Sequence, residues 1–360
     1  MEQNINKYIN SFRRISWITV IAVYFLILVG GIVRSSGSGM GCPDWPKCFG
    51  SVVPPVSVDQ LPENYQEIYL EKRLAKNERF VATLEKLGFK ETAVKIANDK
   101  SILIEEDFNP VKTWIEYLNR LAGVVIGLLI ILTVWKSLPL RKVDAWIPAL
   151  SFFNLFLVIF IGWIGSIVVS TNLLHWMITV HMVLALFLVI LLIYVYHRSG
   201  RLVQSKRPAI AVEIPAKVEF VLLVGTILMF LQVVLGTQVR EQIDIISSSL
   251  GDMLRDEWVG RVGVEFVIHR TFSLVLLGVH VLYFFWAFKY TLKKSPINLW
   301  SQILMILIIM EIATGMGMAY FGIPAFLQPI HLLVGTLIIG VQTLLLLQFR
   351  EYVQYRINTN

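Results

Sequence analysis

The chain alternates long apolar runs with shorter polar connections. Each run is about 20 residues long, which is enough for a helix to cross the hydrocarbon core of a bilayer. Charged or turn-forming residues bound eight such runs, at residues 15–33, 115–135, 145–168, 174–196, 218–236, 264–288, 298–319 and 327–349. The pattern therefore predicts an all-α integral membrane protein with eight transmembrane helices.

Composition excludes a soluble globular domain. Of the 360 residues, 56% are hydrophobic and 16% are charged, whereas soluble domains average about 45–50% apolar and 25% charged. The net charge of +7 comes from basic residues spread over the connections, so we expect a lipid bilayer around the chain and no nucleic-acid partner. With only two cysteines, Cys42 and Cys48, the chain has too few thiolates for an iron–sulfur cluster.

The positions of lysine and arginine predict the orientation, because cytoplasmic loops of membrane proteins are enriched in these residues. Sixteen of the 32 lie in the N-terminal segment, in the C-terminal tail and in the connections after the second, fourth and sixth spans. The short connections on the other side hold three, all between residues 237 and 263. We therefore expect both termini in the cytoplasm and the protein in the inner (cytoplasmic) membrane of the cell.

The spans and connections divide the chain into six segments. These are the first helix (1–33), a long outer loop (34–113), the other three helices of a first half (114–197), a cytoplasmic linker (198–217), a second half of four helices (218–349) and a cytoplasmic tail (350–360). Residues 66–98 of the outer loop predict a helix, with apolar positions at Leu70, Leu74, Val81, Leu84 and Leu87. We favour a polar amphipathic hairpin that caps the membrane domain over a recognition module.

An internal repeat divides the spans into two sets of four. At an offset of 150 residues the matches are Asn119-Arg120 with His269-Arg270, Gly165 with Gly315, and His181 with His331. The first helix matches at an offset of 206, because the long outer loop intervenes, and there Gly30 aligns with Gly236 and Arg34 with Arg240. An even number of helices per half predicts two four-helix bundles of the same orientation, related by an axis along the membrane normal.

The repeat places two histidines at matched depth in the second half. His269 lies near the outer end of its second helix and His331 near the outer end of its fourth. An ionisable side chain at this depth is costly and marks function, and such a pair suits axial ligation of a haem. A lone buried histidine is more often a core residue, but the matching position of His181 in the first half favours ligation.

The first half differs from the second at Asn119, which stands at the position of His269. Because an amide is a poor iron ligand, the site in the first half should use one histidine at most.

Motifs at the outer ends of the helices are more specific. The first helix ends in Gly30-Gly-Ile-Val-Arg-Ser-Ser-Gly-Ser-Gly-Met-Gly-Cys-Pro-Asp-Trp-Pro-Lys-Cys48, and the second opens with Glu116-Tyr-x-x-Arg120. Histidines stand on the fourth, sixth and eighth helices. Together these features resemble the haem A synthase family, over both halves and nearly the whole chain apart from about residues 55–110.

The resemblance implies an activity and its partners. In that family the first half binds haem O, whose ring methyl is oxidised to a formyl group by two successive hydroxylations with loss of water. The product, haem A, serves terminal oxidases, and a b-type haem in the second half passes electrons. The implied partners are haem O, the membrane haem O synthase that supplies it and an electron donor that the sequence does not identify. A homo-oligomer is left open.

The resemblance also assigns residues. His269 and His331 match the ligands of the b-type haem, and His181 matches one ligand of the substrate haem. Glu116 matches the acidic residue beside the substrate. The outer-face cysteine pair of the family is matched by Cys42 and Cys48, whereas Asn119 stands where the family has a histidine.

The chemistry of several residues leaves alternatives open. Glu116, with a pKa raised by burial, is expected to shuttle protons during methyl oxidation; the alternative is an ion pair with an arginine at the membrane surface. Four arginines at the outer membrane level suit haem propionates, although snorkelling to the interface is a strong alternative; they are Arg34, Arg120, Arg240 and Arg270. We expect the two cysteines to form a disulfide on the oxidising face, with a structural role favoured over a redox role.

Two further histidines have weaker assignments. His175 at the outer start of the fourth helix would replace the missing ligand only if the helix start unwinds. His280 lies deeper than His269 on nearly the same face, and core packing is the favoured interpretation.

Two other functions compete with the enzyme. One is a single-haem cytochrome b electron carrier with a degenerate first half, which Asn119 favours but the retained Glu116 and His181 do not. The other is a transporter built on the four-plus-four repeat, although the spans lack the Gly/Pro-broken pair typical of transporter sites.

Overall fold

A computed structural model describes residues 2–98, 107–171, 174–203 and 214–359. Over these residues the chain has 11 α-helices and no β-strand. Eight helices are long and apolar enough to span a membrane, which confirms the predicted number and a multi-pass membrane protein. They are α1 (Glu2–Ser35), α4 (Pro110–Ser137), α5 (Trp146–Ser170), α6 (His175–Gly200), α7 (Ala216–Leu250), α9 (Val264–Tyr290), α10 (Pro296–Tyr320) and α11 (Leu327–Thr359).

Local sequence explains where several helices begin and end. Helix α4 begins at Pro110, a residue that needs no hydrogen-bond acceptor there, and Asn109 caps it by accepting from the Lys112 amide at 3.1 Å. Helix α7 ends at Gly251, which has φ of +70°. The predicted span stops at residue 236, because apolar runs report only the part of a helix that lies in hydrocarbon. The polar extension of α7 therefore carries side chains beyond the predicted span.

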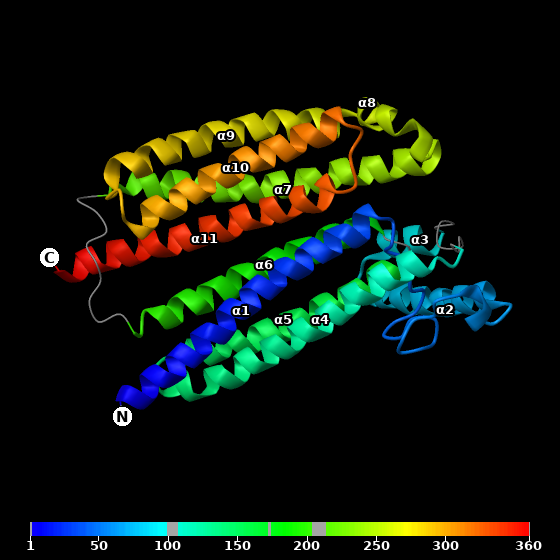
Figure 1. Ribbon diagram of the computed structural model, residues 1–360, viewed down its shortest axis with the longest axis horizontal. Coiled ribbons are helices and arrows are strands. Elements are labelled where there is room, and N and C mark those ends of the chain that lie inside the picture. Colours follow the sequence, from blue (N-terminus) through cyan, green and yellow to red (C-terminus); the bar gives the residue numbers. More distant parts are fainter. Residues whose placement is uncertain (1, 99–106, 172–173, 204–213, 360) are drawn as a thin grey trace.

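The long helices pack as two sets of four. Helices α1, α4, α5 and α6 contact one another in a ring, and α7, α9, α10 and α11 do the same. Each ring encloses its own apolar core. Helix α11 joins the rings by packing against α1 and α6 (Figure 1).

Two glycines allow the sets to approach closely. A Cβ on Gly31 of α1 would lie 2.9 Å from Cβ of Pro329 on α11, and a Cβ on Gly340 of α11 would collide with the Tyr24 hydroxyl of α1. Larger residues at either position would push the helices apart. The interface between the sets therefore depends on these two small residues.

The outer loop forms a cap at one end of the long helices. The start of α1 and the end of α11 lie at the opposite end (Figure 1). The helical structure predicted over residues 66–98 is present as two helices, α2 (Tyr65–Lys86) and α3 (Lys90–Ala97), which are separated at Gly88 with φ of +88°. The expected apolar face is only partly correct, because Leu74 and Leu87 are exposed. The residues that α2 buries are Tyr69, Arg73, Asn77 and Leu84.

Candidate functional site

Two histidines of the second set each face a glycine on a neighbouring helix. A Cβ on Gly236 of α7 would lie 3.2 Å from Cε1 of His269 on α9, and a Cβ on Gly315 of α10 would lie 3.3 Å from Cε1 of His331 on α11. The missing side chain of each glycine thus makes room for an imidazole ring. Helices α9 and α11 lie at opposite corners of their set, since each packs against α7 and α10.

The first set repeats this arrangement with one substitution. A Cβ on Gly165 of α5 would lie 3.4 Å from Cε1 of His181 on α6. Across the set, a Cβ on Gly30 of α1 would lie 4.0 Å from Oδ1 of Asn119 on α4. The residues that the repeat aligns between the two halves therefore form equivalent pairs in the structure, each with a glycine beside a histidine or an asparagine. The Oδ1 atom of Asn119 is buried and has no hydrogen-bond partner among the described residues.

An acidic residue that the sequence analysis missed lies beside His331. The Oε1 atom of Glu311 on α10 is 3.3 Å from Nε2 of His331, and Thr314 Oγ1 is 3.0 Å from Nδ1. The other carboxyl oxygen of Glu311 is buried without a hydrogen-bond partner among the described residues. The sequence does carry a signal for Glu311, because it is the one acidic residue in the apolar run 298–319 and an ionisable side chain at that depth marks function.

The other two histidines do not join this site. His280 is buried in the second set, with Nδ1 2.7 Å from the Leu276 carbonyl oxygen and Nε2 2.7 Å from the Gln342 amide nitrogen. His280 is 1% exposed, in line with the favoured interpretation as a core residue. Helix α6 is already helical at His175, so its start does not unwind there; the side chain of His175 lies outside the described part of the chain.

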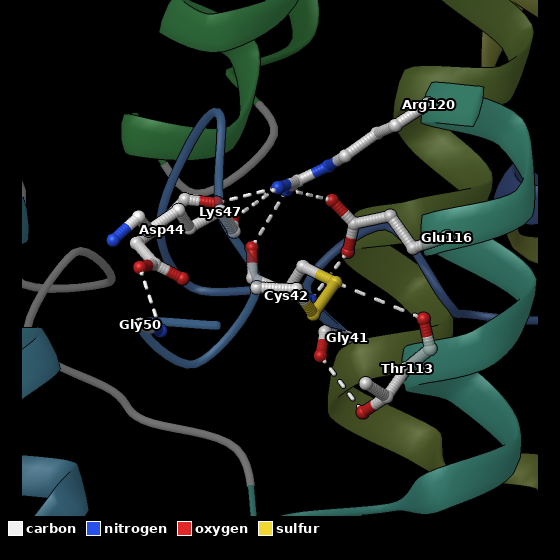
Figure 2. The surroundings of a disulfide bond; sticks show 9 residues. Gly41, Cys42, Asp44, Lys47, Gly50, Thr113, Glu116 and Arg120 are labelled. Atoms are coloured by element: carbon white, nitrogen blue, oxygen red, sulfur yellow. Dashed lines mark hydrogen bonds and ion pairs between the residues drawn. A yellow bond between two sulfur atoms is a disulfide. The ribbon is translucent and has the colours of Figure 1, made fainter. Parts of the chain in front are cut away.

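The predicted disulfide joins Cys42 and Cys48 and closes a loop against the start of α4 (Figure 2). The Thr113 hydroxyl donates to the Gly41 carbonyl oxygen at 2.9 Å. A Cβ on Gly41 would lie 2.5 Å from the Lys112 carbonyl oxygen, so only glycine permits this approach. The loop is thus held in a fixed position at the outer end of the first set.

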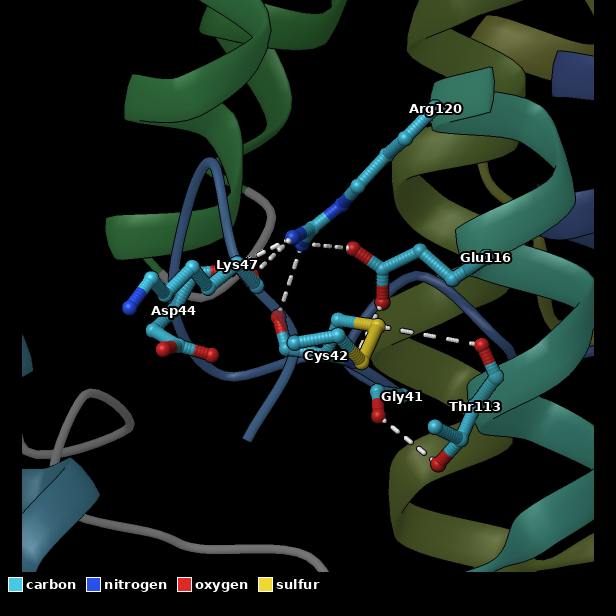
Figure 3. A network of polar contacts seen from close by, with 8 residues as sticks. Gly41, Cys42, Asp44, Lys47, Thr113, Glu116 and Arg120 are labelled. Atoms are coloured by element: carbon cyan, nitrogen blue, oxygen red, sulfur yellow. Dashed lines mark hydrogen bonds and ion pairs between the residues drawn. A yellow bond between two sulfur atoms is a disulfide. The ribbon is translucent and has the colours of Figure 1, made fainter. Parts of the chain in front are cut away.

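Glu116 and Arg120 hold the same loop from α4 (Figure 3). Oε2 of Glu116 accepts the Cys42 amide at 2.7 Å, and Oε1 accepts from Arg120. Arg120 also donates to the carbonyl oxygens of Cys42 at 2.8 Å and Lys47 at 3.0 Å, and to that of Asp44. These contacts match the alternative interpretation of Glu116, an ion pair with an arginine. They also engage the guanidinium of Arg120 in hydrogen bonds to carbonyl oxygens of the loop. A catalytic role of Glu116 stays a prediction.

The other three predicted arginines have different surroundings. Arg34 of α1 forms an ion pair with Asp244 of α7, and Arg240 of α7 forms another with the same residue at 3.0 Å. One carboxylate therefore links the two sets. Asp244 lies in the extension of α7 beyond the predicted span, which is why sequence analysis missed it. Arg270 is exposed, and its guanidinium stacks 5.6 Å from the ring centre of Phe266.

Two side chains of α2 have shifted pKa values beside the disulfide loop. Burial and the neighbouring Asp44 carboxylate raise the pKa of Tyr69 to about 12. Burial lowers the pKa of the Lys76 ammonium group, and the nearby positive charge of Arg120 lowers it further. The outer end of the first set is therefore a partly desolvated site with concentrated positive charge.

Comparison with known proteins identifies the family. A family model described as cytochrome oxidase assembly protein, COX15-CtaA, matches residues 13–86 and 89–343. The chain belongs to the COX15-CtaA family. The resemblance inferred from the motifs is thereby confirmed.

Several relatives of this COX15-CtaA protein are named heme A synthase. The protein from Shewanella oneidensis is 26% identical over 214 residues, which cover 59% of this chain and 53% of the relative. The chain thus matches about half the length of that relative. The proteins from Flavobacterium johnsoniae and Shouchella clausii are 22% and 21% identical, and their matches cover 90% and 85% of this chain and 93% and 85% of the relatives.

The residues of both sets fit the haem chemistry that the COX15-CtaA family implies. In the second set, Gly236 and Gly315 leave space for two imidazole rings on opposite helices, which suits ligation by two histidines. In the first set the equivalent glycines, Gly165 and Gly30, lie beside one imidazole and one amide. Neutral imidazole is a common iron ligand and an amide is not, so the first set suits ligation by one histidine.

Proposed function

We propose that the chain is a haem A synthase, an oxidoreductase that converts a ring methyl of haem O to a formyl group for cytochrome oxidases. The conversion takes two hydroxylations and loss of water. The observation that carries the proposal is the unequal pair of sites: in the second set two opposite helices each place a histidine beside a glycine, whereas in the first set one of the two places an asparagine there. Sites with unequal ligation suit one haem that passes electrons and one that is changed chemically.

In the second set, His269 and His331 are the proposed axial ligands of a b-type haem, which when bound supplies one-electron transfer. The 3.0 Å contact between Thr314 and Nδ1 of His331 fixes the rotation of that ring. Gly236 and Gly315 leave the space in which the rings stand. These residues therefore hold and orient the redox centre.

In the first set, His181 is the proposed ligand of the substrate haem O. Asn119 lies on α4, the helix opposite α6 in this set, and its amide would be a weak ligand for the iron of a bound haem. Glu116 lies one helical turn from Asn119, on the same face of α4. Its proposed role in proton transfer requires the carboxylate to exchange its contacts with Cys42 and Arg120 during turnover.

The outer arginines are proposed to meet the haem propionates. Arg34 and Arg240 suit this role best, because the Nε atom of each is buried without a hydrogen-bond partner among the described residues. Arg270 retains a guanidinium with no ion pair among the described residues. Arg120 is a weaker candidate, since its donors engage Glu116 and the loop carbonyls.

The proposed topology follows from the same repeat. The two sets are duplicated four-helix halves related by an axis along the membrane normal, with both termini cytoplasmic in the inner membrane. The proposed segments are 1–33, 34–113, 114–197, 198–217, 218–349 and 350–360, with substrate in the first half and b-type haem in the second. The proposed partners are the haem O synthase and an electron donor.

Pigment analysis tests the function. The chain is co-expressed with a haem O supply, and the haems are extracted and separated by chromatography. Haem A in the extract is the expected result. Extracts with b-type haem alone would refute the enzyme and favour an electron carrier with a degenerate first half.

A further inference from the structure

The outer helix α2 buries polar side chains. Arg73 is 3% exposed and Asn77 is 6% exposed. These residues are four positions apart and therefore lie on one face of the helix. Both the Nδ2 and Oδ1 atoms of Asn77 lack a hydrogen-bond partner among the described residues. Leaving a buried amide unpaired is unfavourable, so this side chain has hydrogen-bonding capacity for a further partner.

One end of this helix face lies over α5 and α6. Phe80, three residues after Asn77, packs against the apolar cluster of Ile164 and Ile167 on α5 and Met177 on α6. Met177 precedes His181 by about one turn of α6. The face of α2 therefore covers the outer end of the helices that hold the proposed substrate ligand.

The other end lies near the first turns of α4. Lys76, the neighbour of Asn77, is close enough to Arg120 and Asp44 for their charges to interact. Arg120 lies next to Asn119 on α4. Asn77 thus lies on α2 between Lys76, which interacts with Arg120 of α4, and Phe80, which packs against α5 and α6.

This part of α2 has the chemistry of a carboxylate receptor. Arg73 and Lys76 supply positive charge, and the Asn77 amide supplies an unpaired donor. The pKa of Lys76 is lowered by burial and by Arg120, and an incoming anion would relieve both effects. Guanidinium and amide groups bind carboxylate oxygens through directional hydrogen bonds.

Haem O carries two such groups, its propionates. The proposed ligand His181 lies near the outer end of its helix, so propionates reach a polar environment soonest at that end. The arginine best placed on α4, Arg120, is occupied by Glu116 and the loop carbonyls. A receptor on α2 would supply what α4 lacks.

We propose that α2 is the outer wall of the substrate site and that Asn77, flanked by Arg73 and Lys76, binds a propionate of the substrate haem. The proposal rests on the proposed function, because it takes haem O as the substrate. It assigns the outer loop a recognition role, whereas sequence analysis favoured a simple cap.

The test compares haem O with its dimethyl ester, which lacks the carboxylates. The detergent-solubilised full chain, with its b-type haem in place, is titrated with each compound, and binding is followed by absorbance. We expect wild type to bind haem O about tenfold more tightly than the ester. Asn77→Leu, of similar volume, should lose this preference and bind both like the ester. Glu78→Gln, at an exposed neighbouring position on α2, should keep the wild-type preference.

The outcomes separate binding from packing. If Asn77 only fills space, Asn77→Leu should keep the preference for haem O over its dimethyl ester. That result would overturn the proposal. The spectrum of the b-type haem reports folding of each variant. Should Asn77→Leu fail to fold, Lys76→Ala at a partly exposed position serves instead. It should weaken binding of haem O while leaving binding of the ester unchanged, and equal affinities for haem O in Lys76→Ala and wild type would refute the receptor.

Failure of the proposed function gives a different result. A wild-type chain that binds no haem O beyond its b-type haem would refute both the function and the receptor. A wild-type chain that makes haem A while Asn77→Leu keeps full preference for haem O would refute the receptor alone.

Discussion

Replacing Asn119 by histidine should convert the first site to the ligation of the second. The Oδ1 atom of Asn119 lies 4.0 Å from where a Cβ on Gly30 would be, whereas the three imidazole rings lie 3.2–3.4 Å from theirs. The glycine therefore leaves room for a ring at this position. The change also removes a buried, unpaired oxygen, so the free energy of unfolding should change by no more than about 1 kcal/mol.

The expected signature is a change of spin state. With one histidine ligand, the first-site haem is expected to be high-spin and, when reduced, to bind carbon monoxide. In Asn119→His the low-spin haem content should double, from one to two per chain, and the carbon monoxide difference spectrum should disappear. Both are measured on chain purified after co-expression with a haem O supply. Asn119→Gln, which keeps an amide, should behave as wild type.

Two results would refute this reasoning. Wild type that already shows two low-spin haems and no carbon monoxide binding would mean that another group completes the first site. An Asn119→His protein that retains first-site haem with an unchanged spectrum would mean that position 119 does not face the iron. His181→Ala provides the control, because it should lose the first-site haem and keep the spectrum of the second.

Three other predictions follow from described contacts. Replacing His269 or His331 by alanine should abolish the low-spin b-haem spectrum, and an unchanged spectrum would exclude these ligands. Glu116→Ala should stop haem A formation while leaving the b-type haem bound; if Glu116 only anchors the disulfide loop, Arg120→Ala should cause an equal loss, and normal turnover in Glu116→Ala would remove it from the mechanism. Because folding raises the pKa of Tyr69 from 10 to about 12, its contribution to stability is complete below pH 10 and is lost as pH rises through 12. Absorbance at 295 nm should therefore show a tyrosine that ionises late in wild type and is missing in Tyr69→Phe.

The sequence predicted the membrane fold well because its determinants are local. Eight apolar runs specify eight spans, since every backbone polar group in hydrocarbon must be paired within a helix. The errors fall where that constraint ends. Helix α7 continues past residue 236 into a polar segment, and two leucines expected on the apolar face of the loop, Leu74 and Leu87, are exposed.

The sites were predicted only in part. Repeat offsets singled out His181, His269, His331 and Asn119 as candidates, because duplication leaves a trace in the sequence, and each of them lies beside a glycine of a neighbouring helix. They did not identify Glu311, Asp244 or Asn77, whose importance depends on neighbours distant in the chain. For Glu116 the sequence left two roles open, and the structure adds a contact that favours the anchoring role.

The pattern of apolar runs, basic connections and repeated motifs by itself determined the number of spans, the disulfide and the family of this protein. These properties follow from the requirements of single helices and short loops, which the bilayer and the oxidising face impose locally. Tertiary structure alone decided that each ligand position faces a glycine, that Asp244 links arginines of both sets, and that α2 buries an unpaired amide. Those contacts join helices far apart in sequence, and only packing brings such partners within a few ångströms of one another.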